Sequence, residues 1–258
     1  MGGRWRNAAA LLGAAEATDA AGRARIALAA VEVALDQDWF TGTSTAGERL
    51  RTAEKAWAES GAGDRWDLDF LWLRHDYLAR LRVDGQGLSL SPRGKDPEAL
   101  AALRRRVEEL RDRAPGALRA GWAEMYLGLI QDNLFAERAT APTHYERALS
   151  AGERGDDLLA REALRHLGDH DHDAGDHARA LERWQRATAL GARAGAVCGT
   201  LSQQMLLAVL ARDRGDEAGA TSLATEIARW AGALGAGHLE TQARNFLAGV
   251  DPTAPPEQ

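Results

Sequence analysis

The segment DDLLAREALRHLGDHDHDAGDHARALERWQRATAL, residues 156–190, decides the fold of this chain. Ala, Leu, Arg and Glu dominate it, and these residue types favour helix. Gly175-Asp176 interrupts it, as glycine-containing breaks do between helices. No stretch of the chain alternates apolar and polar residues over a useful length, so strand signals are nearly absent. The segment therefore predicts two helices joined by a tight turn, in a protein that is all-α.

The same landmarks recur outside this segment at a spacing of about forty residues, which indicates a repeated structural unit. The matching pairs are Gly175-Asp176 with Gly215-Asp216, Ala180 with Ala220, Gly128 with Gly168, and Tyr145 with Trp184. Small residues at such positions let the two helices of a hairpin approach closely, while Tyr145 and Trp184 fill the space between units. Units of this kind cannot bury their apolar faces alone, so the sequence predicts stacked helical hairpins.

Working outward from this repeat, we expect about five antiparallel helical hairpins and a final helix that covers the exposed end. The expected helix pairs are 22–39 with 45–60, 64–82 with 96–114, 117–135 with 141–152, 156–174 with 177–190, and 196–213 with 216–233, followed by a last helix over 236–249. Pro97 and Pro142 fall at helix starts, where the missing N–H costs nothing. The proline-containing tail 250–258 is expected to be disordered.

The residues Leu164, Leu167, Gly168, Gly175-Asp176, Ala180, Trp184 and Ala187 follow a known hairpin pattern. With them the chain resembles the tetratricopeptide repeat (TPR) family over residues 117–249, and its long spacing is similar to repeats in sensor regions of large bacterial transcriptional regulators and in peptide-pheromone receptors. The resemblance implies a right-handed α-solenoid with a C-terminal capping helix. Residues 1–116 match the motif poorly, and we expect them to form divergent hairpins or a cap over the groove.

In the TPR family the first helix of each hairpin lines a concave groove, and the resemblance implies the same here. The third hairpin would contribute Trp122, Met125, Leu129, Asp132 and Asn133; the fourth Glu162, Arg165, Asp169, His172 and Asp173; the fifth Ser202, Met205, Val209, Arg212 and Asp213. The polar ends of these rows would converge at one level across three helices. Such a groove offers charges that orient a ligand and apolar surface that anchors it.

The segment His166 to His177 holds four of the seven histidines together with four aspartates. His166 and His170 share a helical face and Asp173 lies one turn further, which is a spacing that could bind a divalent transition metal. A metalloprotease is excluded because the His-Glu-x-x-His motif is not present. The alternatives are a polar network in the groove or plain surface exposure. Asp171 falls at a packing position and, if buried, needs a partner such as His144, another histidine or an arginine.

Composition narrows the function classes. Hydrophobic residues make up 45% and charged residues 27% of the 258 positions, as in ordinary globular proteins. The formal net charge of −6 argues against a nucleic-acid-binding protein. No apolar run is long enough to span a membrane, so we expect no membrane partner. Cys198 is the only cysteine, which is typical of a protein of the reducing cytoplasm.

The sequence therefore predicts a non-catalytic binding, adaptor or sensor protein that holds a peptide, a protein partner or a small effector in its groove, with no resident cofactor. The alternative is a metal-dependent or small-molecule-converting enzyme centred on His166–His177. A third hypothesis is a structural adaptor that uses its convex or end surfaces. The N-terminal helices are Ala-rich, so a homodimer formed through them is a further possibility. If residues 1–116 form a cap over the groove, an enclosed small-molecule site is favoured.

Overall fold

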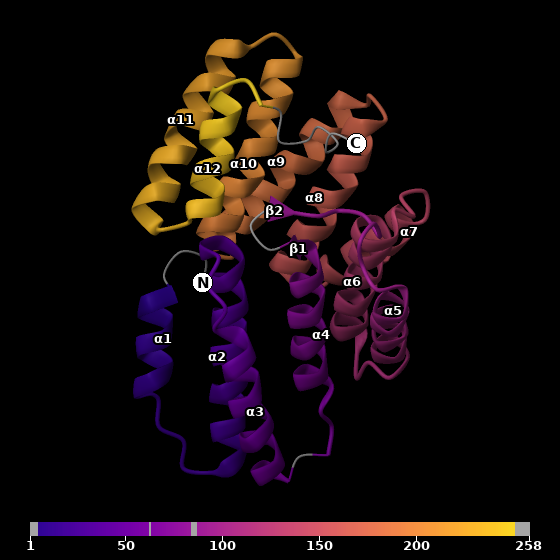
Figure 1. The fold of residues 1–258 in the computed structure, drawn as a ribbon, viewed down its shortest axis with the longest axis vertical. Helices are drawn as coiled ribbons and strands as arrows, with labels where there is room; N and C mark the ends of the chain where they lie inside the picture. The colour runs from indigo at the N-terminus through magenta and orange to yellow at the C-terminus, as the bar shows by residue number, and fades with distance from the viewer. Residues whose placement is uncertain (1–4, 62, 84–86, 251–258) are drawn as a thin grey trace.

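The computed structural model describes residues 5–61, 63–83 and 87–250, and Figure 1 shows these as an all-α architecture. Twelve helices lie in these ranges, together with the two-residue strands β1 (Arg82–Val83) and β2 (Gly87–Leu88), which pair antiparallel. The all-α prediction is confirmed. Residues 251–258, most of the tail predicted to be disordered, lie outside the described part of the chain.

The helix bounds follow the predicted ones closely. In the N-terminal half they are α1 (Trp5–Ala14), α2 (Ala20–Thr41), α3 (Ala46–Ser60), α4 (Trp66–Leu81) and α5 (Pro97–Asp112). In the C-terminal half they are α6 (Ala117–Phe135), α7 (Ala141–Gly152), α8 (Asp157–Asp173), α9 (His177–Arg193), α10 (Val197–Asp213), α11 (Glu217–Leu234) and α12 (Gly237–Leu247). Only α1 was not predicted. No helix in the described ranges is both long and apolar enough to cross a membrane.

The recurring Gly-Asp pairs make the turns between helices. Gly175 and Gly215 have φ angles of 79° and 83°, which lie in the left-handed region that favours glycine. Asp176 and Asp216 then cap the following helices, because their carboxylates accept from the backbone N–H of residues three positions on. The predicted repeat is therefore a repeat of turn chemistry as well as of packing.

Close packing within the hairpins rests on glycine beneath an aromatic ring. A Cβ added at Gly128 would lie 2.5 Å from Cε1 of Tyr145, and one added at Gly168 would lie 2.5 Å from Cδ1 of Trp184. Both aromatic side chains are fully buried. The predicted close approach of the two helices is confirmed, and the rings fill the space directly above the glycines.

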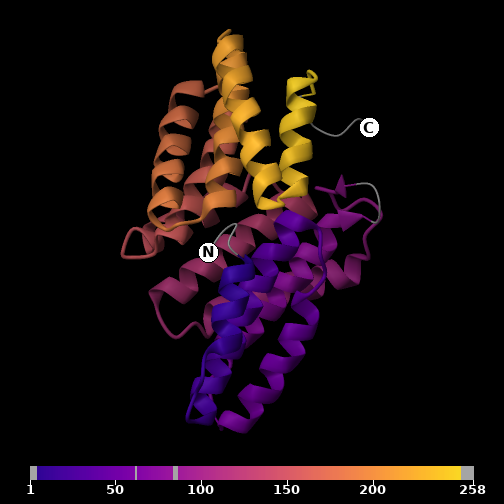
Figure 2. The same cartoon turned by 90° about the vertical axis from the view of Figure 1, so that its left-hand side faces the viewer.

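Helices pack mostly with their neighbours in sequence, as in α6 with α7 and α8 with α9. The first helices of successive hairpins also contact one another in order: α2 with α4, α4 with α6, and α6 with α8. The array returns on itself, because α12 contacts α2 (Figure 2). One apolar cluster joins Trp5, Val33 and Phe40 from the N-terminal helices to Met205 and Phe246 from α10 and α12.

We predict that Gly168→Ala lowers the free energy of unfolding by about 1–3 kcal/mol, because the new methyl group overlaps Trp184 and the hairpin must separate. Urea unfolding measures the change. The matched control is Gly237→Ala in α12, where no atom lies within 4 Å of the added Cβ. Alanine is the better helix former by up to about 1 kcal/mol, so the control variant should be unchanged or slightly stabilised. Equal stability of both variants would contradict the packing account.

Candidate functional site

Charged side chains gather where the first helices of the hairpins face one another. We call this group the inner cluster: Arg74 on α4 with Arg161, Glu162, Arg165 and His166 on α8. The interactions that shift their pKa values also reach Asp36 on α2 and Tyr126 on α6. The cluster is thus formed by residues distant in sequence, and it depends on α2 and α4 lying opposite α8.

Arg161 is the most deeply buried member, at 4% exposure. Its Nη2 donates to the carbonyl oxygen of Gly199 at 2.7 Å, and its Nη1 pairs with Glu162. Two glycines make room for it: a Cβ at Gly199 would lie 2.9 Å from Nη2, and one at Gly191 would lie 3.2 Å from Cδ. Burial lowers the pKa of Arg161 from its usual value, because it disfavours the charged guanidinium.

Glu162 is the acidic centre of the cluster. Burial by itself would raise the pKa of this carboxyl group, but Arg161 and Arg165 more than offset it, and His166 and Arg74 act in the same direction. The pKa of Glu162 is therefore lowered and the group is ionised at neutral pH. Its side chain keeps 30% exposure, so solvent reaches the cluster.

Arg165 and Arg74 are not paired with carboxylates. The side chain of Arg165 makes no hydrogen bond or ion pair to any described residue, and its Nε is buried without a partner. Its backbone carbonyl accepts from Trp184 Nε1 at 3.1 Å, which fixes this turn of α8. Arg74 donates through Nε to the hydroxyl of Tyr126 at 3.2 Å and has no ion pair within the described ranges. Two guanidinium groups are therefore left with unused donors.

His166 stands between the inner cluster and the neighbouring polar network. Its ring stacks on Tyr145, with centroids 5.2 Å apart, and its Nδ1 lies 3.5 Å from a carboxylate oxygen of Asp169. Burial lowers the pKa of His166, so the ring is neutral near pH 7. A neutral imidazole next to Arg165 adds hydrogen-bonding capacity without further positive charge.

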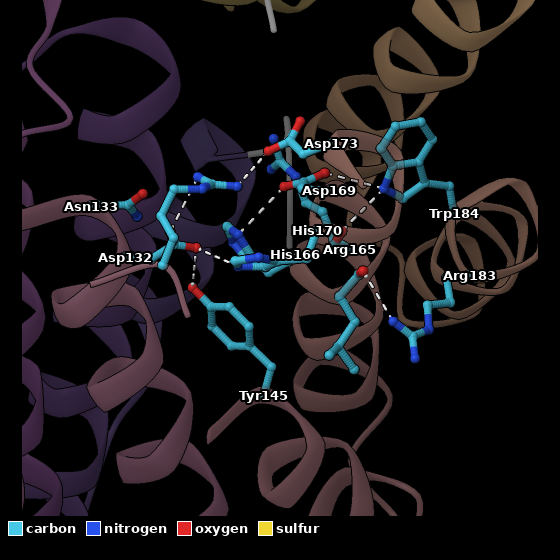
Figure 3. Close-up of polar contacts among 12 residues, drawn as sticks. Asp132, Asn133, Tyr145, Arg165, His166, Asp169, His170, Asp173, Arg183 and Trp184 are labelled. Carbon is cyan, nitrogen blue, oxygen red and sulfur yellow. Dashed lines mark hydrogen bonds and ion pairs between the residues drawn. The ribbon is translucent and has the colours of Figure 1, made fainter. Parts of the chain in front are cut away.

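The second group of polar residues surrounds Asp132 on α6 and links the hairpin of α6 and α7 to that of α8 and α9 (Figure 3). Asp132 Oδ2 lies 2.9 Å from Nε2 of His170 and accepts from the Tyr145 hydroxyl at 3.1 Å. Arg138 lies 3.2 Å from the other carboxylate oxygen and also pairs with Asp173. Burial alone would raise the pKa of Asp132, but the bond from His170 and the charge of Arg138 outweigh it and lower the value.

The residues predicted at the polar ends of the groove are bonded to other groups of the protein itself. His172 Nε2 lies 2.8 Å from Asp213, which joins α8 to α10. Arg212 pairs with Glu217 at 2.8 Å, and its Nη1 donates to the carbonyl oxygen of Phe246 at 2.9 Å. These contacts hold successive hairpins together, so their structural role is already evident without a ligand.

The apolar ends of the predicted rows are covered. Met125 and Met205 are 0% and 1% exposed, so they present no surface to a ligand in this structure. Trp122 donates to Asp156 at 2.8 Å, and Asn133 donates to the Tyr77 hydroxyl at 2.7 Å, which shows that α4 lies over α6. Leu129 is partly buried in the same core. Of the predicted residues, Glu162 and Arg165 belong to the inner cluster, and the carboxylate of Asp169 accepts from Trp184 Nε1.

The predicted metal ligands His166, His170 and Asp173 are not brought together. His166 pairs with Asp169, His170 with Asp132, and Asp173 with Arg138. Among the described residues, no group of three or more His, Cys, Asp or Glu side chains has the geometry of a metal site. The prediction of this ligand set is therefore wrong, because the helical turns aim the three side chains at different neighbours.

Asp171 has an arginine as its partner. Its Oδ2 lies 2.8 Å from Arg183 and 3.8 Å from Arg179, both on α9. His144, the other residue considered, pairs with Glu124 instead. The expectation that a carboxylate at this packing position needs a charged partner is confirmed. Asp171 therefore joins α8 to α9 and is not part of the inner cluster.

Comparison with known proteins identifies no relative: no family model matches the chain, and no curated protein sequence matches it. The functional argument therefore rests on the geometry of the inner cluster. Sequence reasoning missed Arg74, Arg161 and Tyr126, which lie in no repeat motif. The glycines at 191 and 199 were the available signal, since paired small residues beside a buried arginine mark a space reserved for it.

We predict that Asp132→Asn lowers the free energy of unfolding by about 2 kcal/mol at neutral pH, because the substitution removes a buried charged acceptor. The folded-state pKa of Asp132 is lowered, so its contribution is present above the ordinary value of 3.8 and is lost as the pH falls below it. Urea unfolding at pH 7 and near pH 3 measures the difference.

The control for this variant is Asp173→Asn, whose carboxylate is 52% exposed. Its effect should stay below about 0.5 kcal/mol at both pH values. A loss of stability from Asp132→Asn that is the same at both pH values would contradict the assignment of Asp132 as an ionised buried acceptor.

Proposed function

We propose that this protein is a non-catalytic binding protein, built as a right-handed TPR-like solenoid, that holds a small effector at the inner cluster. The ligand would lie between α8 and the N-terminal helices α2 and α4. The single observation that carries this proposal is that Arg165 and Arg74, which both act on Glu162, have no carboxylate in an ion pair with them among the described residues. Buried charges are normally paired, so unpaired ones mark a place for a ligand.

The helical repeat supports this reading. Hairpins joined by Gly-Asp turns, with glycine packed under an aromatic ring, stack in sequence order from α6 to α12. In a solenoid the first helices form the concave face, where ligands bind. Here the first helices of the early hairpins contact those of the later ones, and α12 meets α2. A binding site enclosed between these helices would suit a small molecule better than an extended peptide.

The chemistry of the interior supports binding over catalysis. Burial raises the pKa of the Cys198 thiol to about 12, so it stays protonated and is not a nucleophile at neutral pH. Glu162 is held by Arg161, and the carboxylate of Asp169 accepts from Trp184 at 3.1 Å. These two acidic groups therefore hold neighbouring side chains in place. An adaptor role through the outer surfaces stays a prediction.

The contact between α2 and α12 offers a route by which occupancy could be signalled. Trp39 on α2 lies 6.4 Å from the ring of His238 on α12, measured between ring centroids. A ligand held between α4 and α8 would favour one curvature of the array over another. The same contact would then tighten or loosen when the ligand binds.

The test is native mass spectrometry on tag-free protein, purified gently and then exposed to a small-molecule extract of its host cells. We expect a noncovalent adduct on the wild type that is lost in Arg165→Gln, because the guanidinium binds it. Arg186→Gln is the matched control, since Arg186 is 50% exposed and pairs with Glu153 on the outer surface. A bare wild-type mass, or an adduct retained equally by Arg165→Gln, would overturn the proposal.

A further inference from the structure

We infer that the effector is a small organic oxyanion, bearing a carboxylate or a phosphate group, and that Arg74 and Arg165 bind this group from opposite helices. The inference rests on the proposed function and names the ligand class for the same site. It follows from three features of the inner cluster: which donors are unused, how the one carboxylate is occupied, and which neutral polar group lies on the adjacent helix.

The first feature is the surplus of donors. A guanidinium carries five N–H donors in a planar fork and no acceptor. Arg165 uses none of its side-chain donors on a described residue, and Arg74 uses only Nε, on the hydroxyl of Tyr126. Oxyanions match the fork geometry with two parallel hydrogen bonds, which makes them the favoured partners of such groups. A cationic ligand would meet repulsion from both arginines.

The second feature is that Glu162 does not satisfy this demand. Its carboxylate pairs with Arg161, on the same helix, and forms no ion pair with Arg74 or Arg165. Both arginines nevertheless act on the carboxyl group electrostatically and lower the pKa of Glu162. Arg74, Arg161 and Arg165 therefore all act on this one carboxylate, whose ion pair is with Arg161. Glu32 and Asp36 also act on Arg74 electrostatically, but they form no ion pair with it. The unused guanidinium donors therefore favour a further negative group.

The third feature is Gln203 on α10, which is fully buried and has no partner for either side-chain amide atom among the described residues. It lies one helical turn after Gly199, whose carbonyl accepts from Arg161, and so it is on the same side of α10. A buried amide without a hydrogen-bond partner is destabilising, because its lost hydration is not replaced. Its NH2 group can donate two hydrogen bonds and its oxygen can accept, which fits a ligand that carries a polar substituent beside its anionic group.

The test uses defined probes on tag-free protein freed of bound ligand by unfolding and refolding. Thermal unfolding and titration calorimetry are run with succinate, with inorganic phosphate, and with the uncharged succinamide, against sodium chloride at matched ionic strength. A ligand that binds the folded state raises its melting temperature, so at least one oxyanion should raise it and succinamide should not. The ratio of the dissociation constants for succinate and phosphate identifies which anionic group the site prefers.

Variants then locate the site. Arg165→Gln and Arg74→Gln should each weaken the binding of the oxyanion about tenfold or more, because each removes a charged fork. Arg165→Lys keeps the charge without the fork and should bind with intermediate affinity. Arg186→Gln should bind as the wild type does. Circular dichroism and the melting temperature without ligand establish that each variant is folded. If Arg165→Gln does not fold, Arg165→Lys replaces it in the binding measurements.

Each outcome decides something. Equal binding to wild type, Arg74→Gln and Arg165→Gln overturns the assignment of these arginines. A native adduct that is cationic or uncharged overturns the ligand class and leaves the proposed binding function standing. No adduct from the host extract, together with no stabilisation by either oxyanion, overturns both the ligand class and the proposed function.

Discussion

The packing of Trp184 over Gly168 is the contact on which the rest of the structure depends. With no side chain at Gly168, α9 can lie close to α8, and the buried indole fills the space. The indole Nε1 then donates to Asp169 and to the carbonyl oxygen of Arg165, each at 3.1 Å. These bonds set the rotation of α8, and thereby direct Glu162 and Arg165 toward the interior while Asp171 faces α9.

The second constraint is the return of the array on itself. Contacts between sequence neighbours alone would leave an open row of hairpins. The apolar cluster that joins Phe40 to Met205, and the packing of α4 on α6, bring the N-terminal helices against α6, α10 and α12. This placement puts Arg74 opposite α8 and changes the electrostatics of the interior. The same charges on an open surface would be solvated and worth little.

Local features of the fold could be read from the sequence, and long-range ones could not. The predicted bounds of α6 and α7 agree with the structure, because glycine, proline and aspartate set helix ends through short-range chemistry. The metal ligand set was wrong and the burial of Met125 and Met205 was not foreseen, since both depend on which helix lies opposite. The N-terminal half lacks the repeat residues, so nothing local predicted that Arg74 would act on Glu162 of α8.

Hydrogen–deuterium exchange of the protein with and without its bound effector tests the central claim, that the inner face is the binding site, most directly. The account predicts slower exchange in α4 and α8 around Arg74 and Arg165, with smaller changes where α2 meets α12. Protection confined to the second helices of the hairpins, α7, α9 and α11, would contradict it, because those helices lie on the opposite side of each hairpin.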